Sequence, residues 1–262
     1  MPELPDLEVF KDNIFKKLTS KRLIRLVVFS PKITTPQVVL EDELLGRELQ
    51  SITRHGKELL FDFADKRVVS AHLMLNGNMS IRENTSAKSV INNKVLALVF
   101  ENESIVFHDT GSIGTVIKYK PFPGKAPDAL GSDFTLEYFL TAACKNSFAN
   151  IKAFLIDQKI IKGIGNAYAD EILWFARISP KSVTGKIPEE VMGRLYEAIG
   201  TVLRNAIVSI KAISPDIISG EERSFLSVHS KTKKKTDTGF PIIVEMIATK
   251  KTYFTDEQVV YM

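Results

Sequence analysis

The spacing of apolar residues changes twice along the chain, and each change predicts a different kind of structure. In residues 7–18 apolar side chains recur three or four positions apart, which predicts a helix with one buried face. That face consists of Leu7, Phe10, Ile14, Phe15 and Leu18. Short apolar runs typical of β-strands follow, at residues 23–29, 58–63, 67–75, 95–100, 104–109 and 114–119. Short strands without helical patterns between them predict an antiparallel β-sandwich, capped by the first helix.

The second change follows a stretch dense in proline and glycine, residues 121–133, which is the best candidate for a domain boundary. Beyond it the apolar period becomes helical, and we expect helices at residues 134–146, 150–161, 165–178 and 188–212. Past residue 225 the sequence is first polar and basic. It then becomes β-like at residues 240–249 and 251–256, which predicts a terminal hairpin.

These patterns predict a two-domain α+β protein. We expect an N-terminal antiparallel β-sandwich with a capping helix at residues 1–120 and a linker at residues 121–135. A helical domain is expected at residues 136–225, and the β-hairpin at residues 226–262.

Composition and charge narrow the class of partner. Of the 262 residues, 44% are hydrophobic and 25% are charged, which is ordinary for a globular protein and excludes a disordered or collagen-like chain. The 35 basic residues exceed the 31 acidic ones by only four. Residues 230–251 hold six lysines against Asp237 and Glu245, a local balance of 6 − 2 = +4. A basic hairpin favours a nucleic-acid contact, and a solvated lysine-rich loop is the alternative.

Several kinds of site and location are excluded. Cys144 is the only cysteine, so an internal disulfide and a multi-thiolate zinc site are ruled out, and a reducing compartment fits. The four histidines show no metal-ligand spacing, and we expect no metal and no cofactor. No apolar stretch approaches the length of a membrane span, and the acidic start lacks the features of a secretory signal. We therefore expect a soluble, intracellular monomer, cytoplasmic and nucleoid-associated if the source is bacterial.

The amino terminus carries candidate chemistry. If Met1 is removed, Pro2 becomes a terminal secondary amine, and α-amino groups titrate near neutrality. Such an amine can act as a nucleophile that forms an iminium with a sugar aldehyde carbon, as lysine does in Schiff bases. Glu3 beside it can act as general acid or base. The alternative is a stiff, exposed terminus without chemistry.

The helical half adds a specific resemblance. Residues 151–180 resemble the helix–two-turns–helix segment of the formamidopyrimidine-DNA glycosylase/endonuclease VIII family. Residues 2–5, Pro-Glu-Leu-Pro, are similar to the start of that family, residues 54–63 resemble its lysine-bearing hairpin, and residues 130–134 resemble its linker. The resemblance implies a bifunctional DNA glycosylase and AP lyase of base excision repair, with damaged double-stranded DNA as partner. It also implies that Pro2 attacks C1′ of the deoxyribose, that Glu3 assists, and that β,δ-elimination nicks the strand.

The resemblance extends to residues that hold the DNA backbone. It implies that Lys57 and Asn166 grip phosphates around the flipped nucleotide, and that Lys152 also reaches the backbone. Gly163 and Gly165 allow a tight turn before a helix start, where N–H groups and the helix dipole favour a phosphate. The alternatives are a helix cap for Asn166 and a solvated strand lysine for Lys57. Lys250 is expected in the minor groove, where the family usually has arginine.

The loops that read the lesion differ from the family pattern. Met74 or Leu75, depending on a one-residue shift, and Ile113 are the apolar residues expected to fill the hole left by the flipped base. Gly111 stands where an arginine would contact the orphaned cytosine. The segment after residue 213 is also short compared with the loop that caps 8-oxoguanine in purine-specific members. These departures favour pyrimidine-type or ring-opened lesions, or weak selectivity.

The terminal hairpin departs from the zinc finger of many family members. Lys235, Thr238, Thr255 and Gln258 stand where those members carry four cysteines. None can replace a thiolate, so we expect a zincless finger held by packing alone.

Two rival functions stay open. A DNA-binding protein that kept the scaffold and lost all or most of its excision activity is compatible with Gly111 and the altered finger. An RNA-associated or ribosome-associated protein is the third possibility, because helix–two-turns–helix segments occur there too.

Overall fold

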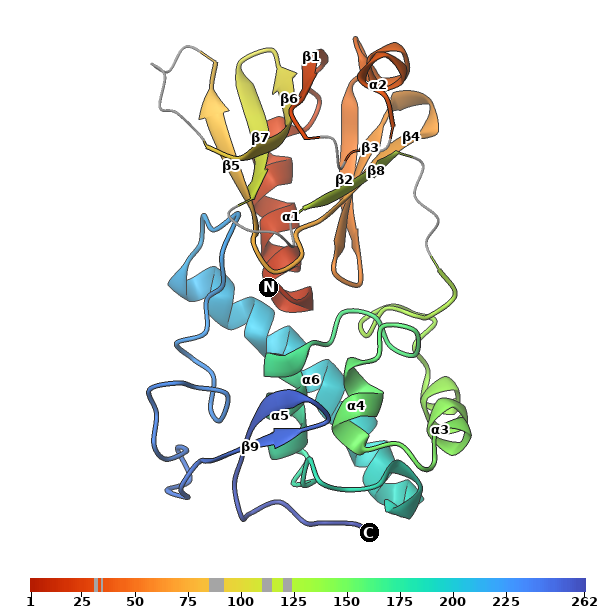
Figure 1. Ribbon diagram of the computed structural model, residues 1–262, viewed down its shortest axis with the longest axis vertical. Helices are drawn as coiled ribbons and strands as arrows, with labels where there is room; N and C mark the ends of the chain where they lie inside the picture. The colour runs from red at the N-terminus through yellow and green to blue at the C-terminus, as the bar shows by residue number, and fades with distance from the viewer. Residues whose placement is uncertain (31–32, 34, 85–91, 110–114, 120–123) are drawn as a thin grey trace. The chain divides into compact units, whose positions relative to one another are not determined.

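The computed structural model describes residues 1–30, 33, 35–84, 92–109, 115–119 and 124–262. The chain forms two compact units (Figure 1). Unit 1 comprises Met1–Pro123 and Ser214–Glu221, and unit 2 comprises Gly124–Ile213 and Glu222–Met262. The division after residue 123 falls inside the expected linker. Each unit is described by itself below.

Unit 1 is a β-sandwich with a helix at its start (Figure 1). One sheet has the strand order β1-β6-β7-β5 and the other β2-β3-β4-β8, and both are antiparallel. The strands are β1 (Leu23–Val28), β2 (Leu49–His55), β3 (Glu58–Phe63), β4 (Arg67–His72), β5 (Gly77–Glu83), β6 (Lys94–Phe100), β7 (Glu103–Asp109) and β8 (Val116–Tyr119). The predicted fold class is confirmed for this half.

Aromatic side chains join the two sheets. Phe61 of β3 meets Phe107 of β7 edge-to-face, with ring centroids 5.7 Å apart. Phe63 and Phe100 stack at 6.4 Å. Aromatic pairs of this kind combine a large buried apolar area with a preferred geometry, so they fix how the sheets face each other.

Helix α1 (Leu4–Leu18) covers this core with the apolar face expected from its sequence, and Phe10 and Ile14 are fully buried. Asp6 in its first turn and Lys16 and Lys17 in its last turn complement the helix dipole.

Unit 1 also contains elements that the apolar pattern did not predict. Helix α2 (Gln37–Leu44) follows Pro36 and buries only Leu40 and Leu44, too few positions to establish a helical period. Strands β2 (LQSITRH) and β5 (GNMSIRE) each contain only two large apolar residues, so no apolar run marked them. A short 3-10 turn, η1 (Ala64–Lys66), links β3 to β4.

The segment Ser214–Glu221 belongs to unit 1, although the sequence placed it in the helical domain. The Asn13 amide of α1 donates to the carbonyl oxygens of Pro215 at 2.8 Å and Ile217 at 2.9 Å. The Ser219 hydroxyl accepts from the Met79 N–H at 2.9 Å. These tertiary contacts, which leave no local sequence pattern, place the segment with the β-sandwich.

Unit 2 is helical and ends in a two-stranded hairpin. Its helices are α3 (Leu136–Lys145), α4 (Ile151–Ile156), α5 (Asn166–Phe175) and α6 (Glu189–Ile213), with a 3-10 turn η2 (Thr184–Lys186). Side chains of Thr135 and Asn150 cap α3 and α4. Helix α4 ends at Ile156, five residues before the predicted end, because Asp157 leaves the helical conformation and accepts the Lys159 N–H at 2.8 Å. No described helix is long and apolar enough to cross a membrane.

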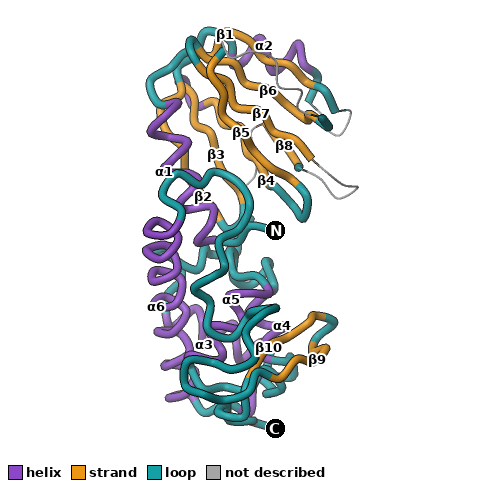
Figure 2. Tube along the Cα trace, turned by 90° about the vertical axis from the view of Figure 1, so that its left-hand side faces the viewer, coloured by secondary structure: helices purple, strands orange, loops and turns teal. Residues whose placement is uncertain are grey.

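The hairpin pairs β9 (Ile243–Ile247) with β10 (Lys250–Phe254), as predicted. Its turn residues Ala248 and Thr249 have φ values of +49° and +63°, the geometry that matches the twist of two short antiparallel strands. Figure 2 shows the hairpin in orange beside the helices of the same unit, and β10 contacts α5. The turn brings Lys250 to the tip of the hairpin.

Candidate functional site

The amino terminus is held rigidly at the head of α1. Pro2 is buried, and Glu3 is only 5% exposed. The Asp6 carboxylate accepts the Glu3 N–H at 2.8 Å. The Met1 amino group pairs with the Glu221 carboxylate. Glu3 is therefore fixed in place beside Pro2 by the first turn of the helix.

Lys57 lies in the two-residue turn between β2 and β3, and its neighbours tie this turn to α1. The Arg54 guanidinium donates to the Gly56 carbonyl oxygen at 3.0 Å and pairs with the Glu8 carboxylate of α1 at 2.7 Å. Gly56 has a φ of +60°, which the turn requires and which glycine adopts without strain. Lys57 itself is 8% exposed, so the solvated strand lysine considered above does not describe it.

His72, for which the sequence predicted no role, is the last residue of β4. Burial lowers the pKa of His72; Glu58 opposes this shift, while Lys57 and Lys118 add to it. The Met74 N–H donates to Nδ1 of the ring at 3.0 Å, so the neutral ring carries its proton on Nε2. The only feature of the sequence that could have pointed to His72 is its position two residues before Met74, in the segment expected to fill the space of the flipped base.

The turn between β4 and β5 presents Leu75. Met74 has a φ of +52°, and the Gly77 N–H donates to the Leu73 carbonyl oxygen at 2.8 Å. A Cβ atom at residue 77 would lie 2.2 Å from that oxygen, so only glycine fits. Leu75 is 57% exposed whereas Met74 is half-buried, which makes Leu75 the more prominent apolar side chain of the turn. Ile113 and Gly111 lie outside the described residues.

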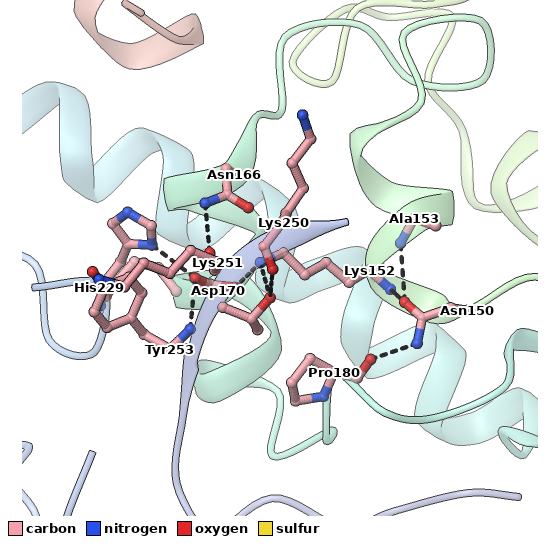
Figure 3. A network of polar contacts seen from close by, with 12 residues as sticks. Asn150, Lys152, Ala153, Asn166, Asp170, Pro180, His229, Lys250, Lys251 and Tyr253 are labelled. Carbon is pink, nitrogen blue, oxygen red and sulfur yellow. Dashed lines mark hydrogen bonds and ion pairs between the residues drawn. The ribbon is translucent and has the colours of Figure 1, made fainter. Parts of the chain in front are cut away.

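In unit 2, Asn166 stands at the start of α5. Gly163 has a φ of +103°, which confirms the need for glycine in the preceding turn, whereas Gly165 has extended backbone and is itself the N-cap. Asn166 is the first helical residue, so the interpretation as a cap is corrected. Its Nδ2 donates to the Lys251 carbonyl oxygen at 2.9 Å, and its buried Oδ1 has no hydrogen-bond partner (Figure 3).

Lys250 begins β10 directly after the hairpin turn and is exposed. Figure 3 shows its side chain extending away from the polar contacts around Asp170, in contrast to Lys152. An exposed ammonium at a hairpin tip is available to a polyanion.

Lys152 does not reach the surface, and the expectation that it contacts the DNA backbone is contradicted. Its side chain is 0% exposed. Its Nζ lies 2.7 Å from Oδ1 of Asp170 and donates to Oγ1 of Thr252 at 2.6 Å. The ammonium is therefore an internal ion-pair partner between α4, α5 and β10.

A hydrogen-bonded cluster occupies the region where related fingers carry zinc ligands. Oε2 of Glu257 accepts from Thr238 at 2.9 Å and from Thr255 and Trp174 at 3.1 Å each, and Oε1 lies 2.8 Å from the Arg177 guanidinium. Burial works to raise the pKa of Glu257, but these hydrogen bonds and the Arg177 charge lower it.

The other positions of the expected tetrad are also occupied by protein contacts. Gln258 accepts the Thr255 N–H and donates to the Ile178 carbonyl oxygen, both at 2.8 Å. Lys235 forms a backbone bridge to Pro241. Within the described part of the chain, no group of histidine, cysteine, aspartate and glutamate side chains can hold a metal ion.

Helices α4 and α5, joined by the turns at residues 157–165, give unit 2 the architecture of a helix–two-turns–helix domain. Two family models match the chain: the formamidopyrimidine-DNA glycosylase N-terminal domain over residues 1–116 and the formamidopyrimidine-DNA glycosylase H2TH domain over residues 125–216. The chain belongs to the formamidopyrimidine-DNA glycosylase family.

Individual relatives agree with this assignment. A formamidopyrimidine-DNA glycosylase from Carboxydothermus hydrogenoformans is 37% identical over 205 residues, which cover 78% of this chain and 76% of the relative. One from Lactococcus lactis subsp. lactis is 28% identical over 247 residues, 90% of each chain. The crystal structure of the Lactococcus lactis enzyme bound non-covalently to DNA containing an AP site has a TM-score of 0.85 and 25% identity, and covers 98% of this chain and 99% of that one.

Proposed function

We propose that this protein is a DNA glycosylase of base excision repair that acts on damaged double-stranded DNA as a monomer, and that it also cleaves the resulting abasic site. The observation that carries this proposal is the Pro2-Glu3 terminus, buried at the head of α1 and fixed by Asp6. The names of its relatives, and the binding of one of them to DNA containing an AP site, support the same activity.

The chemistry begins at the amine that removal of Met1 leaves on Pro2. Its lone pair attacks C1′ of the damaged nucleotide, a C–N bond forms, and the glycosidic bond breaks with its electrons leaving on the base. The new ammonium group at Pro2 then loses its proton, which neutralises the departing base. Glu3 protonates the sugar ring oxygen, which opens the ring and gives an iminium between Pro2 and C1′. Loss of a proton from C2′ then expels the 3′-phosphate in β-elimination, and a second elimination expels the 5′-phosphate.

Other residues hold the DNA for this step. Lys57 and Lys250 supply positive charge for the phosphate backbone and the minor groove, and Asn166 donates a neutral hydrogen bond to a phosphate. Leu75, with Met74 beside it and together with Ile113, occupies the space left by the flipped base. Because Gly111 stands where the family pattern has an arginine, we propose oxidised pyrimidines or ring-opened bases as the substrate class.

The second candidate is a lesion-binding protein without excision activity, and Gly111 in place of an arginine together with the altered terminal hairpin favours it. If Met1 is retained, the Pro2 nitrogen is an amide nitrogen and cannot act as the nucleophile. A chain that retains Met1 would bind lesions without forming the iminium.

Borohydride trapping decides between the two candidates. The protein is incubated with a duplex that contains an abasic site, reduced with borohydride, and examined for a covalent complex, while intact mass reports whether Met1 is present. We expect a covalent complex in the fraction that lacks Met1 and none in a preparation that retains it. Trapping by the Met1-retaining protein excludes Pro2 as nucleophile, and its absence from the Met1-free protein favours the binding protein.

A further inference from the structure

A buried polar network in unit 2 links two helices to the hairpin strand that carries Lys250 (Figure 3). At its centre is the ion pair between Lys152 of α4 and Asp170 of α5, both side chains 0% exposed. Oδ2 of Asp170 also accepts the Tyr253 N–H at 3.0 Å and contacts Nδ1 of His229 at 2.7 Å. The pair is therefore hydrogen-bonded to the backbone of β10 through Asp170.

The same network continues from the ion pair to the tip of the hairpin. Lys152 donates to Oγ1 of Thr252, and the Thr252 hydroxyl donates to the Lys250 carbonyl oxygen at 2.9 Å. Asn166, one helical turn before Asp170 on α5, donates to the Lys251 carbonyl oxygen. Consecutive carbonyl groups at the start of β10 are thus fixed by side chains of unit 2.

We propose that the Lys152–Asp170 ion pair is a positioning device for DNA binding, which acts through Thr252 to hold Lys250 beside Asn166. This inference rests on the proposed function, since it gives Lys250 and Asn166 a DNA strand to contact. None of the positioning residues touches the DNA. Lys152, Asp170 and Thr252 act only by fixing the start of β10.

Stability alone is a poor reason for this arrangement. A buried ion pair costs much of its Coulomb energy in desolvation, and well-packed apolar residues often stabilise as well. Apolar contacts are not directional, so they do not fix the orientation of a carbonyl group as a hydrogen bond does. Here further contacts of the pair run to Thr252, the Tyr253 N–H and His229, and two of these three belong to β10. The network therefore specifies the orientation of the strand.

Thr252→Val tests the proposal with little change of shape, because it removes only the hydroxyl that relays the contact. The measurement is the affinity for a duplex that carries a tetrahydrofuran abasic analogue, across a salt series. We expect Thr252→Val to weaken binding about three- to tenfold, the size of a lost hydrogen bond. We also expect the salt slope to flatten towards that of Lys250→Ala, and Thr252→Ser to restore both affinity and slope.

Thr184→Val is the matched control. Thr184 is 2% exposed and lies in the same unit, and its hydroxyl and its N–H both donate to the Ala149 carbonyl oxygen at 2.9 Å rather than to the hairpin. Its variant should lose similar thermal stability and keep wild-type DNA affinity. A fall in affinity equal to that of Thr252→Val would show a general effect of stability and would overturn the proposal.

A double-mutant cycle supplies the sharper criterion. If Thr252 acts through Lys250, the variant Thr252→Val combined with Lys250→Ala binds no more weakly than Lys250→Ala alone. Fully additive losses would overturn the inference while leaving the proposed function intact. A wild-type protein that neither binds the analogue duplex nor forms the borohydride-trapped complex would instead contradict the proposed function itself.

Discussion

Arg54 and Glu8 form an ion pair at 2.7 Å that ties α1 to the turn carrying Lys57. Arg54 is 6% exposed at its side chain and also donates to the Gly56 carbonyl oxygen within that turn. This bridge connects the helix that follows Pro2 and Glu3 with the turn that carries Lys57, a candidate phosphate contact. The Arg54 guanidinium therefore contributes to their relative position in unit 1.

Replacing Arg54 tests this contribution. Arg54→Gln removes one of the two basic groups, Arg54 and Lys11, that pair with the partly buried Glu8 carboxylate, so we expect a melting temperature about 3–6 °C lower. We also expect single-turnover excision to slow at least about tenfold, because a small displacement of a catalytic group is costly. Arg194→Gln, which breaks the exposed pair with Glu190, is the control and should change neither quantity. A normal excision rate in Arg54→Gln would contradict the positioning role.

The pKa of His72 predicts a loss of stability in acid. Burial lowers that pKa in the folded protein, so below the ordinary value of 6.5 the unfolded chain binds more protons than the folded one. Stability contributed by the neutral ring is thus present at higher pH and is lost as the pH falls through 6.5 towards the folded pKa. Melting temperatures of the wild type and His72→Gln at pH 8 and pH 5 measure this. The wild type should lose more than the variant, and equal losses would exclude His72 as a source.

Removal of metal is expected to have no effect. The Glu257 cluster supplies hydrogen bonds where related fingers have thiolates, so prolonged treatment with EDTA or phenanthroline should leave DNA binding and melting temperature unchanged. Glu257→Ala should instead lower the melting temperature, since it leaves the Trp174 and Thr238 donors without their acceptor. Stoichiometric zinc in elemental analysis would contradict this account of the hairpin.

Gly77 is predicted to tolerate no side chain. A Cβ atom would lie 2.2 Å from both the Leu73 carbonyl oxygen and the Thr115 hydroxyl, so Gly77→Ala must displace the turn that presents Leu75. We expect a destabilisation of roughly 1–3 kcal/mol, together with weaker discrimination between lesion and intact duplexes. Gly193→Ala on α6 meets nothing within 4 Å and should be neutral or stabilising. Normal discrimination in Gly77→Ala would show that the turn is not part of lesion recognition.

The sequence predicted the layers of the fold but not the contacts that cross them. The apolar patterns located the α1 stripe and the strands with continuous apolar runs, because these are local features of the sequence. The sequence did not predict that Lys152 is buried, because a lysine in an amphipathic helix is expected to be exposed. Its partner Asp170 lies on another helix, so no local pattern indicates the ion pair. Glu257 was missed for a similar reason: it occupies none of the four expected ligand positions and acts through residues distant in the chain.

The candidate site followed a similar rule. Motifs in a characteristic order along the chain predicted the candidate residues Pro2, Glu3, Lys57, Asn166 and Lys250. The contacts of these residues with DNA stay predictions. The structure added the surroundings of these residues: the Arg54 bridge beside Lys57, His72 next to the Leu75 turn, and the strand contacts around Asn166. Those depend on hydrogen bonds between elements, for which a single sequence carries no periodic signal.

The final prediction separates residues that hold the DNA backbone from those that read the lesion. Lys57→Ala and Lys250→Ala should weaken binding to lesion and control duplexes alike, and each should flatten the slope of log K against log salt by roughly 0.9 per lost phosphate contact. Asn166→Ala should lower affinity with the slope unchanged, because the amide is neutral. Leu75→Ala should keep the slope and lose preference for the lesion, since an apolar wedge contributes only after the base has left the stack.

Lys186→Ala removes an exposed lysine outside the proposed contacts and should match the wild type throughout this series. Measuring all variants on matched duplexes over one salt range makes the slopes directly comparable. A wild-type slope in Lys57→Ala together with an altered slope in Leu75→Ala would overturn the division, because counterion release follows charge and not apolar contact.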